Sequence, residues 1–313
     1  MGSVQALPDT SKLDGLVWFF GYPIKHSFSP LLHQTVYDNI NLKWSQIPFE
    51  SLDTPQFLEL LKDPKCHGST VTMPHKVSII PHLDELTDEC RDVGACNTIF
   101  FKEKDGNRLL VGTNTDIIGV REAFFQNLPK GATPDIYRGR PGLVVGGGGA
   151  CRSAVYALHR FVGCSQIYIV NRDVAEVEAV ILSCKKDGFG DSLIHVKTVA
   201  EAEALASPGT IVSCIPNFPP KTPEEIEARE VIVKFLEKKE KGAILEMCYH
   251  PTPYTEIGDI SEKLGWQVIL GTEAMIYQGL EQDRYWTGRK VEDLPSKEVH
   301  VAIAEALKAH GRG

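Results

Sequence analysis

Three short polar segments in the first half of the chain carry residue types that could perform acid-base chemistry. They span residues 26–30, 70–76 and 113–116, and each lies where an apolar run that predicts a strand gives way to polar residues. The second segment ends at Lys76 and the third at Asp116. Because the carboxyl ends of parallel strands face the ligand crevice of an α/β sheet, we expect these segments to line a binding site.

A glycine-rich turn in the second half is the other pattern that could do chemistry. Between residues 143 and 161 an apolar strand pattern, a run of glycines and a helical pattern follow one another. Gly146, Gly148, Gly149 and Ala150 belong to the turn, where backbone N–H groups and the helix N-terminus could hold a pyrophosphate. The third glycine of the usual dinucleotide fingerprint is absent, so the flanking strand and helix carry much of the inference.

The choice of dinucleotide is expected at the end of the next strand. Asn171, Arg172 and Asp173 follow the glycine turn by about 25 residues, where such units set the selectivity for the ribose. Arg172 could hold the 2′-phosphate of NADP. Asp173 could instead accept a hydrogen bond from the free 2′-hydroxyl of NAD and repel a phosphate. These two residues favour opposite cofactors.

Strand and helix patterns alternate along the chain, which is typical of an α/β fold. A polar, Pro- and Gly-rich stretch at residues 128–141 separates two series of strands and predicts a domain junction near residue 130. We expect an N-terminal α/β substrate domain over residues 1–130 and a Rossmann-type dinucleotide-binding domain over residues 131–272, with a cleft between them. Helices between about residues 273 and 313 are expected to complete the first domain. The expected strands are 17–21, 44–48, 68–72, 98–101, 109–112, 143–145, 166–170, 210–214, 243–247 and 267–270.

Composition and charge argue against several classes of protein. The chain has 313 residues, enough for two domains, and its net charge of -8 without a basic cluster argues against nucleic-acid binding. Its eight cysteines form no CxxC pair, so we expect no metal site and no disulfide framework. No apolar run is long enough to cross a bilayer, and no secretory signal pattern is present. We expect a cytoplasmic protein without a membrane partner, either a monomer or a homodimer.

Seven motifs in a fixed order give the chain a resemblance to a known family. The chain resembles the shikimate/quinate 5-dehydrogenases, and the resemblance runs from about residue 16 to about residue 290. The motifs are GYPIKHSFSP from Gly21, VTMPHK from Val71, GACNT from Gly94, GTNTD from Gly112, GGGGACR from Gly146, EMCYHP from Glu246 and YQG from Tyr277. This resemblance implies reversible hydride transfer between a ring hydroxyl of a small acid and a nicotinamide dinucleotide, NAD or NADP.

The resemblance also implies a role for each matching residue. Lys76 and Asp116 would form the catalytic pair that handles the proton of the reacting hydroxyl, with Lys76 acting as a base or as an electrostatic clamp. Ser27 and Ser29 would bind the substrate carboxylate through their hydroxyl groups. The remaining substrate contacts would come from Thr70, Thr72, Asn97, Tyr249 and Gln278.

Two departures from the family pattern bear on the substrate and the cofactor. Thr70 stands where members that act on shikimate usually carry asparagine, and Asp173 stands where NADP-dependent members usually carry threonine. Because a carboxylate beside a 2′-phosphate is unfavourable, Asp173 favours NAD. The chain is most similar to fungal-type NAD-dependent quinate dehydrogenases, which implies the products 3-dehydroquinate or, from shikimate, 3-dehydroshikimate. The alternatives are an NADP-dependent shikimate dehydrogenase of aromatic amino-acid biosynthesis and a non-catalytic regulator of quinate use.

Overall fold

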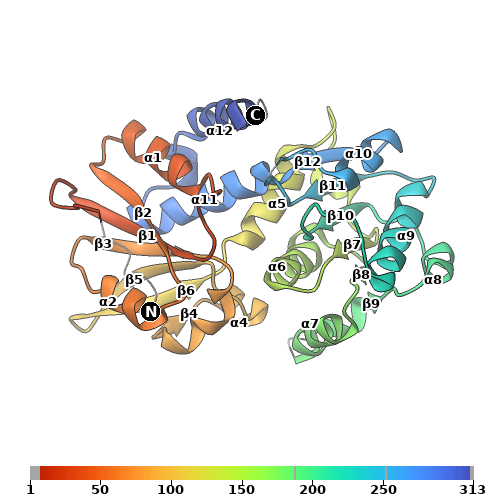
Figure 1. Ribbon diagram of the computed structural model, residues 1–313, viewed down its shortest axis with the longest axis horizontal. Helices are drawn as coiled ribbons and strands as arrows, with labels where there is room; N and C mark the ends of the chain where they lie inside the picture. Colours follow the sequence, from red (N-terminus) through yellow and green to blue (C-terminus); the bar gives the residue numbers. More distant parts are fainter. Residues whose placement is uncertain (1–7, 187, 251, 311–313) are drawn as a thin grey trace. The chain divides into compact units, whose positions relative to one another are not determined.

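The computed structural model describes residues 8–186, 188–250 and 252–310, which form two compact units (Figure 1). The first unit contains the chain up to Thr115 and the chain from Met275 onward, and the second unit runs from Asp116 to Ala274. Each unit is built on a six-stranded sheet. The α/β fold class expected from the sequence is confirmed.

The sheet of the first unit mixes parallel and antiparallel strands. Its strands are β1 (Gly15–Gly21), β2 (Trp44–Glu50), β3 (Cys66–Val71), β4 (Glu85–Leu86), β5 (Thr98–Lys104) and β6 (Asn107–Thr113), in the order β2-β1-β3-β5-β6-β4. Strand β5 is antiparallel to both β3 and β6. The β5–β6 hairpin turns at Asp105 and Gly106, which both have positive φ, at 52° and 75°. This hairpin interrupts the strand and helix alternation that the sequence predicted.

Two helices that are far apart in the sequence are joined in the first unit. Its helices are α1 (Ser29–Asn39), α2 (Thr54–Leu60), α3 (His75–Ser78), α4 (Asp88–Val93), α11 (Gly271–Thr287), which belongs to this unit from Met275 onward, and α12 (Ser296–His310). The buried side chains of His33 on α1 and Asp283 on α11 contact each other at 2.9 Å. Trp286 on α11 donates its indole N–H to the carbonyl of Ile99 on β5 at 3.0 Å. Helix α11 is therefore fixed against both α1 and the sheet.

The sheet of the second unit is entirely parallel. Its strands are β7 (Gly142–Val145), β8 (Ile167–Val170), β9 (Leu193–His195), β10 (Thr210–Ser213), β11 (Ala243–Glu246) and β12 (Gln267–Leu270), in the order β12-β11-β10-β7-β8-β9. This is the doubly wound order of a Rossmann fold, with the strand order reversing between β7 and β10. Ligands of such sheets bind beyond the carboxyl ends of the strands at that point.

The helices of the second unit begin before the junction expected near residue 130. They are α5 (Asp116–Gln126), α6 (Gly149–Ala157), α7 (Val174–Lys186), α8 (Val199–Ala204), α9 (Pro223–Glu237) and α10 (Glu256–Lys263). Helix α5 packs against α6, and this contact places α5 in the second unit although the polar stretch at residues 128–141 follows it. The division between the units therefore lies between Thr115 and Asp116.

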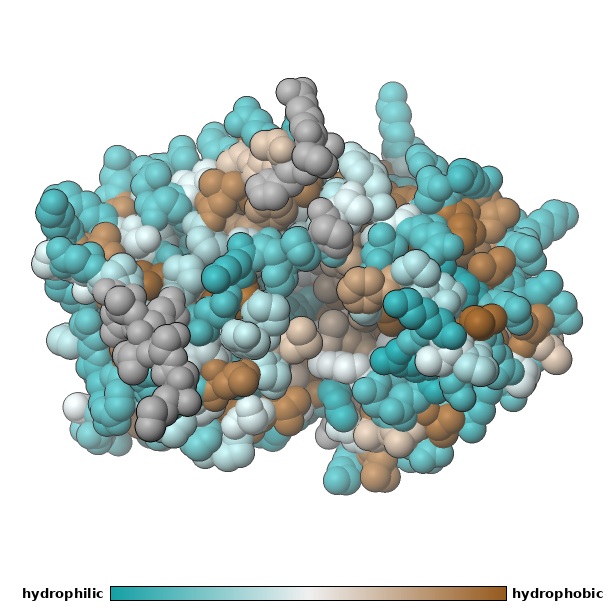
Figure 2. All heavy atoms as spheres, in the orientation of Figure 1, coloured by the Kyte–Doolittle hydropathy of each residue, from teal (hydrophilic) through white to brown (hydrophobic). Residues whose placement is uncertain are grey.

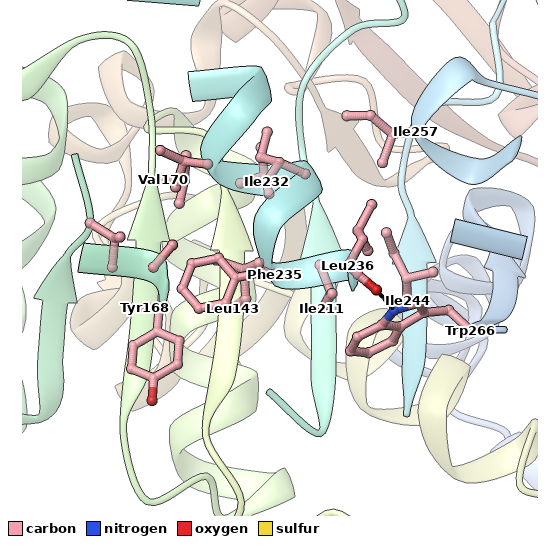
Figure 3. Close-up of a cluster of buried hydrophobic side chains, with 14 residues drawn as sticks. Leu143, Tyr168, Val170, Ile211, Ile232, Phe235, Leu236, Ile244, Ile257 and Trp266 are labelled. Carbon is pink, nitrogen blue, oxygen red and sulfur yellow. Dashed lines mark hydrogen bonds between the residues drawn. The ribbon is translucent and has the colours of Figure 1, made fainter. Parts of the chain in front are cut away.

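Helix α9 is anchored on the second sheet by a buried apolar cluster (Figure 3). Ile232, Phe235 and Leu236 of α9 lie over the strands, and the Phe235 ring stacks on Tyr168 of β8 with 5.3 Å between ring centroids. Trp266 donates its indole N–H to the carbonyl of Leu236 at 2.9 Å. Large aromatic side chains that are packed in this way hold a helix firmly on a sheet.

Hydrophilic side chains cover most of the face seen in Figure 2, and hydrophobic ones are scattered among them. Within the part of the chain that the structure describes, no helix combines the length and the apolar character needed to span a membrane. Nor do the described residues contain a group of three or more His, Cys, Asp or Glu side chains that could hold a metal ion.

Candidate active site and cofactor pocket

The glycine turn of the second unit is crowded on one side and open on the other. Gly146 follows β7 with a φ of 128°, a conformation that L side chains rarely adopt. A Cβ at Gly147 would come within 2.5 Å of Asn171 Nδ2 and Glu176 Oε2. A Cβ at Gly148, directly before α6, would meet nothing within 4 Å. The turn therefore leaves open space at the N-terminus of α6, which suits a phosphate group.

A cavity of about 420 Å³ adjoins this turn. Its wall is formed by the glycine turn, the end of β8, the loop after β10 and the first turns of α9. The position matches the crevice at the reversal of strand order, where doubly wound sheets bind their ligands. The volume, the open helix N-terminus and the glycine turn fit the adenosine and pyrophosphate parts of a dinucleotide.

The cavity brings together four of the residues expected to bind the cofactor. Gly146, Gly148, Asn171 and Arg172 line the cavity. The other three expected residues are not part of the lining. Gly149 and Ala150 are the first two residues of α6, and Asp173 lies directly before α7. The carboxylate of Asp173 accepts the backbone N–H groups of Ala175 at 2.8 Å and Glu176 at 3.2 Å, so it caps that helix.

Two carboxylates that the sequence did not single out also line the cavity. Glu176 accepts a hydrogen bond at 2.7 Å from Asn171 Nδ2. Glu225, in the first turn of α9, pairs with the guanidinium of Arg172. The sequence contained a signal for the helix position of Glu225, because Thr222 and Glu225 have the spacing of a capping box. It contained no signal for the pairing with Arg172, which lies in the loop between β8 and α7.

The two expected carboxylate-binding serines occupy the start of α1. Ser29 is the first residue of the helix and Phe28 is its N-cap. Ser27 Oγ accepts the backbone N–H of Ser29 at 3.2 Å. Both serines are half-buried. The two serines therefore lie on either side of the N-cap Phe28, at the start of α1.

A chain of side-chain hydrogen bonds runs inward from Ser29. Ser29 Oγ donates to Gln46 Oε1 at 2.9 Å, and Gln46 Nε2 donates to Thr70 Oγ1 at 2.9 Å. Thr70 in turn donates to Gln282 Oε1 at 3.2 Å, and Gln282 Nε2 donates to Thr98 Oγ1 at 2.9 Å. Gln46, Gln282 and Thr98 are all buried. Sequence reasoning missed these three residues: Gln46 and Gln282 belong to none of the motifs, and Thr98 lies in the GACNT motif but was given no role.

The far end of the chain reaches two more of the expected substrate residues. Thr98 Oγ1 donates to Asn97 Oδ1 at 2.7 Å, and Asn97 Nδ2 donates to Gln278 Oε1 at 2.9 Å. Asn97 Oδ1 also accepts the backbone N–H of Thr115 at 2.7 Å. Ser29, Thr70, Asn97 and Gln278 therefore belong to one connected network. Such networks hold their members in place when every buried polar group has a partner.

Lys76 lies on the short helix α3, half-buried, four residues after Thr72. Its backbone carbonyl accepts the N–H of Cys96 at 2.7 Å, and the backbone N–H of Thr72 donates to the carbonyl of Phe20 at 2.8 Å. The preceding His75 is buried and stacks on the ring of Phe20 with 3.9 Å between centroids. The segment that carries Lys76 is therefore anchored to the sheet by both hydrogen bonds and packing.

Asp116 is the first residue of α5 and is only 6% exposed. It directly follows Thr115, whose backbone N–H is held by the side chain of Asn97. Asn114, two residues before it, donates from its side chain to the carbonyl of Ala95 at 2.8 Å. The chain leading to Asp116 is thus fixed by buried side-chain amides.

Tyr249 lies in the loop after β11 and is half-buried. The strand ends at Glu246, which is 2% exposed and accepts the backbone N–H of Cys248 in the loop at 3.1 Å. Burial raises the pKa of Glu246 to about 7, although the Cys248 N–H acts in the opposite direction. Pro251, the last residue of the EMCYHP motif, lies outside the described residues.

Comparison with known proteins finds relatives over nearly the whole chain. A family model described as the shikimate dehydrogenase substrate binding domain matches residues 19–99. The quinate dehydrogenase of Emericella nidulans is 47% identical over 313 residues, covering 94% of each chain. The pentafunctional AROM polypeptide of Candida tropicalis is 35% identical over 92% of this chain, which spans only 18% of that polypeptide.

Solved structures show the same architecture. The dehydroquinate dehydratase and shikimate dehydrogenase structure from S. pombe AroM has a TM-score of 0.77 at 32% identity, over 93% of this chain and 53% of that one. The quinate dehydrogenase of Corynebacterium glutamicum, solved in complex with NAD, shares the fold, with a TM-score of 0.77 at 20% identity over 93% of this chain and 99% of that one. The chain belongs to the shikimate and quinate dehydrogenase family, whose members are oxidoreductases that act on a CH–OH group.

Proposed function

We propose that this protein is a quinate dehydrogenase that also accepts shikimate and that uses NAD. The observation that carries the proposal is the hydrogen-bonded network that links Ser29, Thr70, Asn97 and Gln278. A polyhydroxylated acid needs donors and acceptors at several fixed positions, and a buried network supplies them without a buried cation. The relative that is 47% identical over 94% of this chain is named a quinate dehydrogenase, which supports quinate as the first choice.

Ser27 and Ser29 would bind the carboxylate of the acid, while Thr72, Asn97 and Gln278 would bind its ring hydroxyls. Tyr249 would border the substrate. Retention of both serines is compatible with quinate and with shikimate, since both acids carry the carboxylate. Thr70 would influence substrate choice through the network, because its hydroxyl is bonded to Gln46 and Gln282.

Lys76 and Asp116 would handle the proton of the reacting hydroxyl. As the carbinol carbon is oxidised, its C–H bond breaks with the electron pair leaving as hydride, and the O–H proton passes to Lys76 Nζ. Asp116 would orient the ammonium group that results. A bound nicotinamide dinucleotide supplies the acceptor for the hydride.

The cavity of the second unit would hold the dinucleotide. Its pyrophosphate would lie at Gly146 and Gly148, at the N-terminal end of α6 where Gly149 and Ala150 begin the helix. Asn171, Arg172 and Asp173 would border the adenine ribose. We favour NAD over NADP because of the negative charge of Asp173. Arg172 in the cavity wall is the observation that supports the alternative, an NADP-dependent shikimate dehydrogenase.

A two-by-two steady-state assay tests the proposal: quinate or shikimate against NAD+ or NADP+, with kcat/KM compared. We expect the highest value for quinate with NAD+ and a value for NADP+ lower by about tenfold or more. The highest value for shikimate with NADP+ would instead establish the alternative function. Binding of quinate without turnover by either dinucleotide would identify a regulator that has kept only the fold.

We propose that the protein works in the cytoplasm, as a monomer or a homodimer. All eight cysteines lie within the described residues, where none of them forms a disulfide, and six of them are buried, which suits a reducing compartment. Cell fractionation would test the compartment, and size-exclusion chromatography with light scattering would measure the oligomeric state.

A further inference from the structure

We propose that Glu225 helps to select NAD. Its carboxylate pairs with the guanidinium of Arg172, which is then engaged and not open to a 2′-phosphate, and it places a fixed negative charge in the wall of the cofactor cavity. The inference rests on the proposed function, since it takes this cavity to be the dinucleotide site. It adds to Asp173 a second residue, on another helix, that would disfavour a 2′-phosphate.

The carboxylate of Glu225 is held on both of its oxygens. Oε1 accepts from Arg172 Nη1, and Oε2 accepts the backbone N–H groups of Lys221 at 2.7 Å and Thr222 at 3.1 Å. The backbone of Glu225 donates in return to Thr222 Oγ1 at 3.2 Å, which completes a capping box. These backbone bonds, and then Arg172, hold the pKa of Glu225 below its ordinary value, so the carboxylate is charged at neutral pH.

The helix that carries Glu225 has a fixed place in the unit. Ile232, Phe235 and Leu236 of α9 are buried against the sheet, as Figure 3 shows. The same sheet carries Arg172, which is the second residue after the end of β8. The ion pair therefore joins two elements whose positions are set by the core, and Arg172 is held by a partner that does not move freely.

The pair changes what Arg172 offers to a ligand. A free guanidinium could bind a 2′-phosphate in a bidentate way. With Glu225 in place, a phosphate must either displace this carboxylate or lie beside it, and both outcomes are unfavourable for a dianion. Glu176, bonded to Asn171 in the same cavity wall, adds further negative charge. The neutral 2′-hydroxyl of NAD meets no such repulsion.

Calorimetric titration of the intact protein with NAD+ and NADP+, without any acid substrate, tests the inference. Glu225→Gln keeps an amide oxygen that can accept the two backbone N–H groups but removes the charge. We expect it to raise NADP+ affinity about tenfold and to change NAD+ affinity by less than about threefold. Glu224→Gln is the matched control, since Glu224 is the exposed neighbour on the same helix and lies outside the cavity wall, and it should leave the ratio unchanged.

Arg172→Leu shows whether the gain in NADP+ affinity in Glu225→Gln depends on the release of Arg172 or only on the loss of negative charge. Alone, it should alter NADP+ affinity by less than about threefold, because Glu225 already occupies Arg172, and in the Glu225→Gln background it should abolish the gain. An unchanged NADP+ to NAD+ ratio in Glu225→Gln overturns the inference, as does a large loss of NADP+ affinity in Arg172→Leu alone. If the wild type binds neither dinucleotide, the proposed function itself fails, which is a different result.

Discussion

Asn97 accepts the backbone N–H of Thr115 through its side-chain Oδ1 at 2.7 Å, and this bond fixes the chain directly before Asp116. The residue before Asn97, Cys96, donates its own backbone N–H to the carbonyl of Lys76, also at 2.7 Å. One dipeptide therefore anchors the main chain at Lys76 and directly before Asp116, the two residues that we propose for the proton. Anchoring by buried groups keeps such residues in place between turnovers.

Lys76→Met tests the proposed proton acceptor. The methionine side chain has a similar length but cannot take a proton, so we expect kcat with quinate to fall by a factor of about 10² to 10⁴ while NAD+ affinity stays the same. Steady-state kinetics and NAD+ titration measure the two quantities. Lys62→Met is the control, because Lys62 is exposed and pairs with Glu59 on the surface. A Lys76→Met protein that retains wild-type kcat would remove Lys76 from the mechanism.

Thr70→Val tests the hydrogen-bond network. Valine has the shape of threonine without the hydroxyl, so Gln46 Nε2 and Gln282 Oε1 both lose a partner in a buried position. We expect the free energy of unfolding to fall by about 1–3 kcal/mol and kcat/KM for quinate to fall about tenfold. Urea unfolding and steady-state kinetics measure these effects. Thr70→Ser keeps the hydroxyl and should retain most of both quantities; equal losses in Ser and Val would show that packing, not the network, matters at this position.

The sequence predicted those parts of the fold that depend on local pattern. Strand β12 lies at residues 267–270, where its apolar run predicted it, and the glycine turn does precede a helix. The β5–β6 hairpin was missed, although Asp105 and Gly106 form a dipeptide typical of tight hairpin turns. That local signal was present in the sequence. The antiparallel position of β5 beside β3 depends on pairing between distant segments, which periodicity does not reveal.

The site was predicted unevenly for a similar reason. Motifs identified Ser29, Asn97 and Gln278, and the structure places them in one network. Gln46 and Gln282, which connect that network, come from segments more than 200 residues apart and carry no motif. The pairing of Glu225 with Arg172 likewise joins residues 53 positions apart. Such contacts exist only once the sheet has assembled, so local sequence patterns cannot predict them.

Glu246 should make the stability of the protein depend on pH. Because burial raises its pKa from 4.5 to about 7, the folded protein binds more protons at this residue than the unfolded chain does between those two values. Its contribution to stability is therefore complete below about pH 4.5 and is lost as the pH rises through 7. Glu246→Gln, which is always neutral, should raise the free energy of unfolding at pH 8 by about 1–3 kcal/mol relative to the wild type.

Urea unfolding at pH 5 and pH 8 measures this difference. At pH 5 the two proteins should have similar stabilities, since the wild-type carboxyl is then largely protonated in the folded state. Glu240→Gln is the control, because Glu240 is exposed in the same unit and should show no such pH dependence. A Glu246→Gln protein that is less stable than the wild type at pH 8 would mean that the ionised carboxylate is itself stabilising.

Asp173 combines a structural and an electrostatic role, and two substitutions separate them. Its carboxylate caps α7 by accepting from the N–H groups of Ala175 and Glu176. Asp173→Ala should therefore lower the free energy of unfolding by about 1 kcal/mol, whereas Asp173→Asn keeps an acceptor and should lower it by less. Both remove the negative charge, so both should raise kcat/KM with NADP+ relative to NAD+ by about tenfold. If only the alanine variant changes the ratio, the cause is a distorted start of α7 and not the lost charge. If neither variant changes the ratio, groups other than Asp173 determine the cofactor, and Glu225 is the first to test.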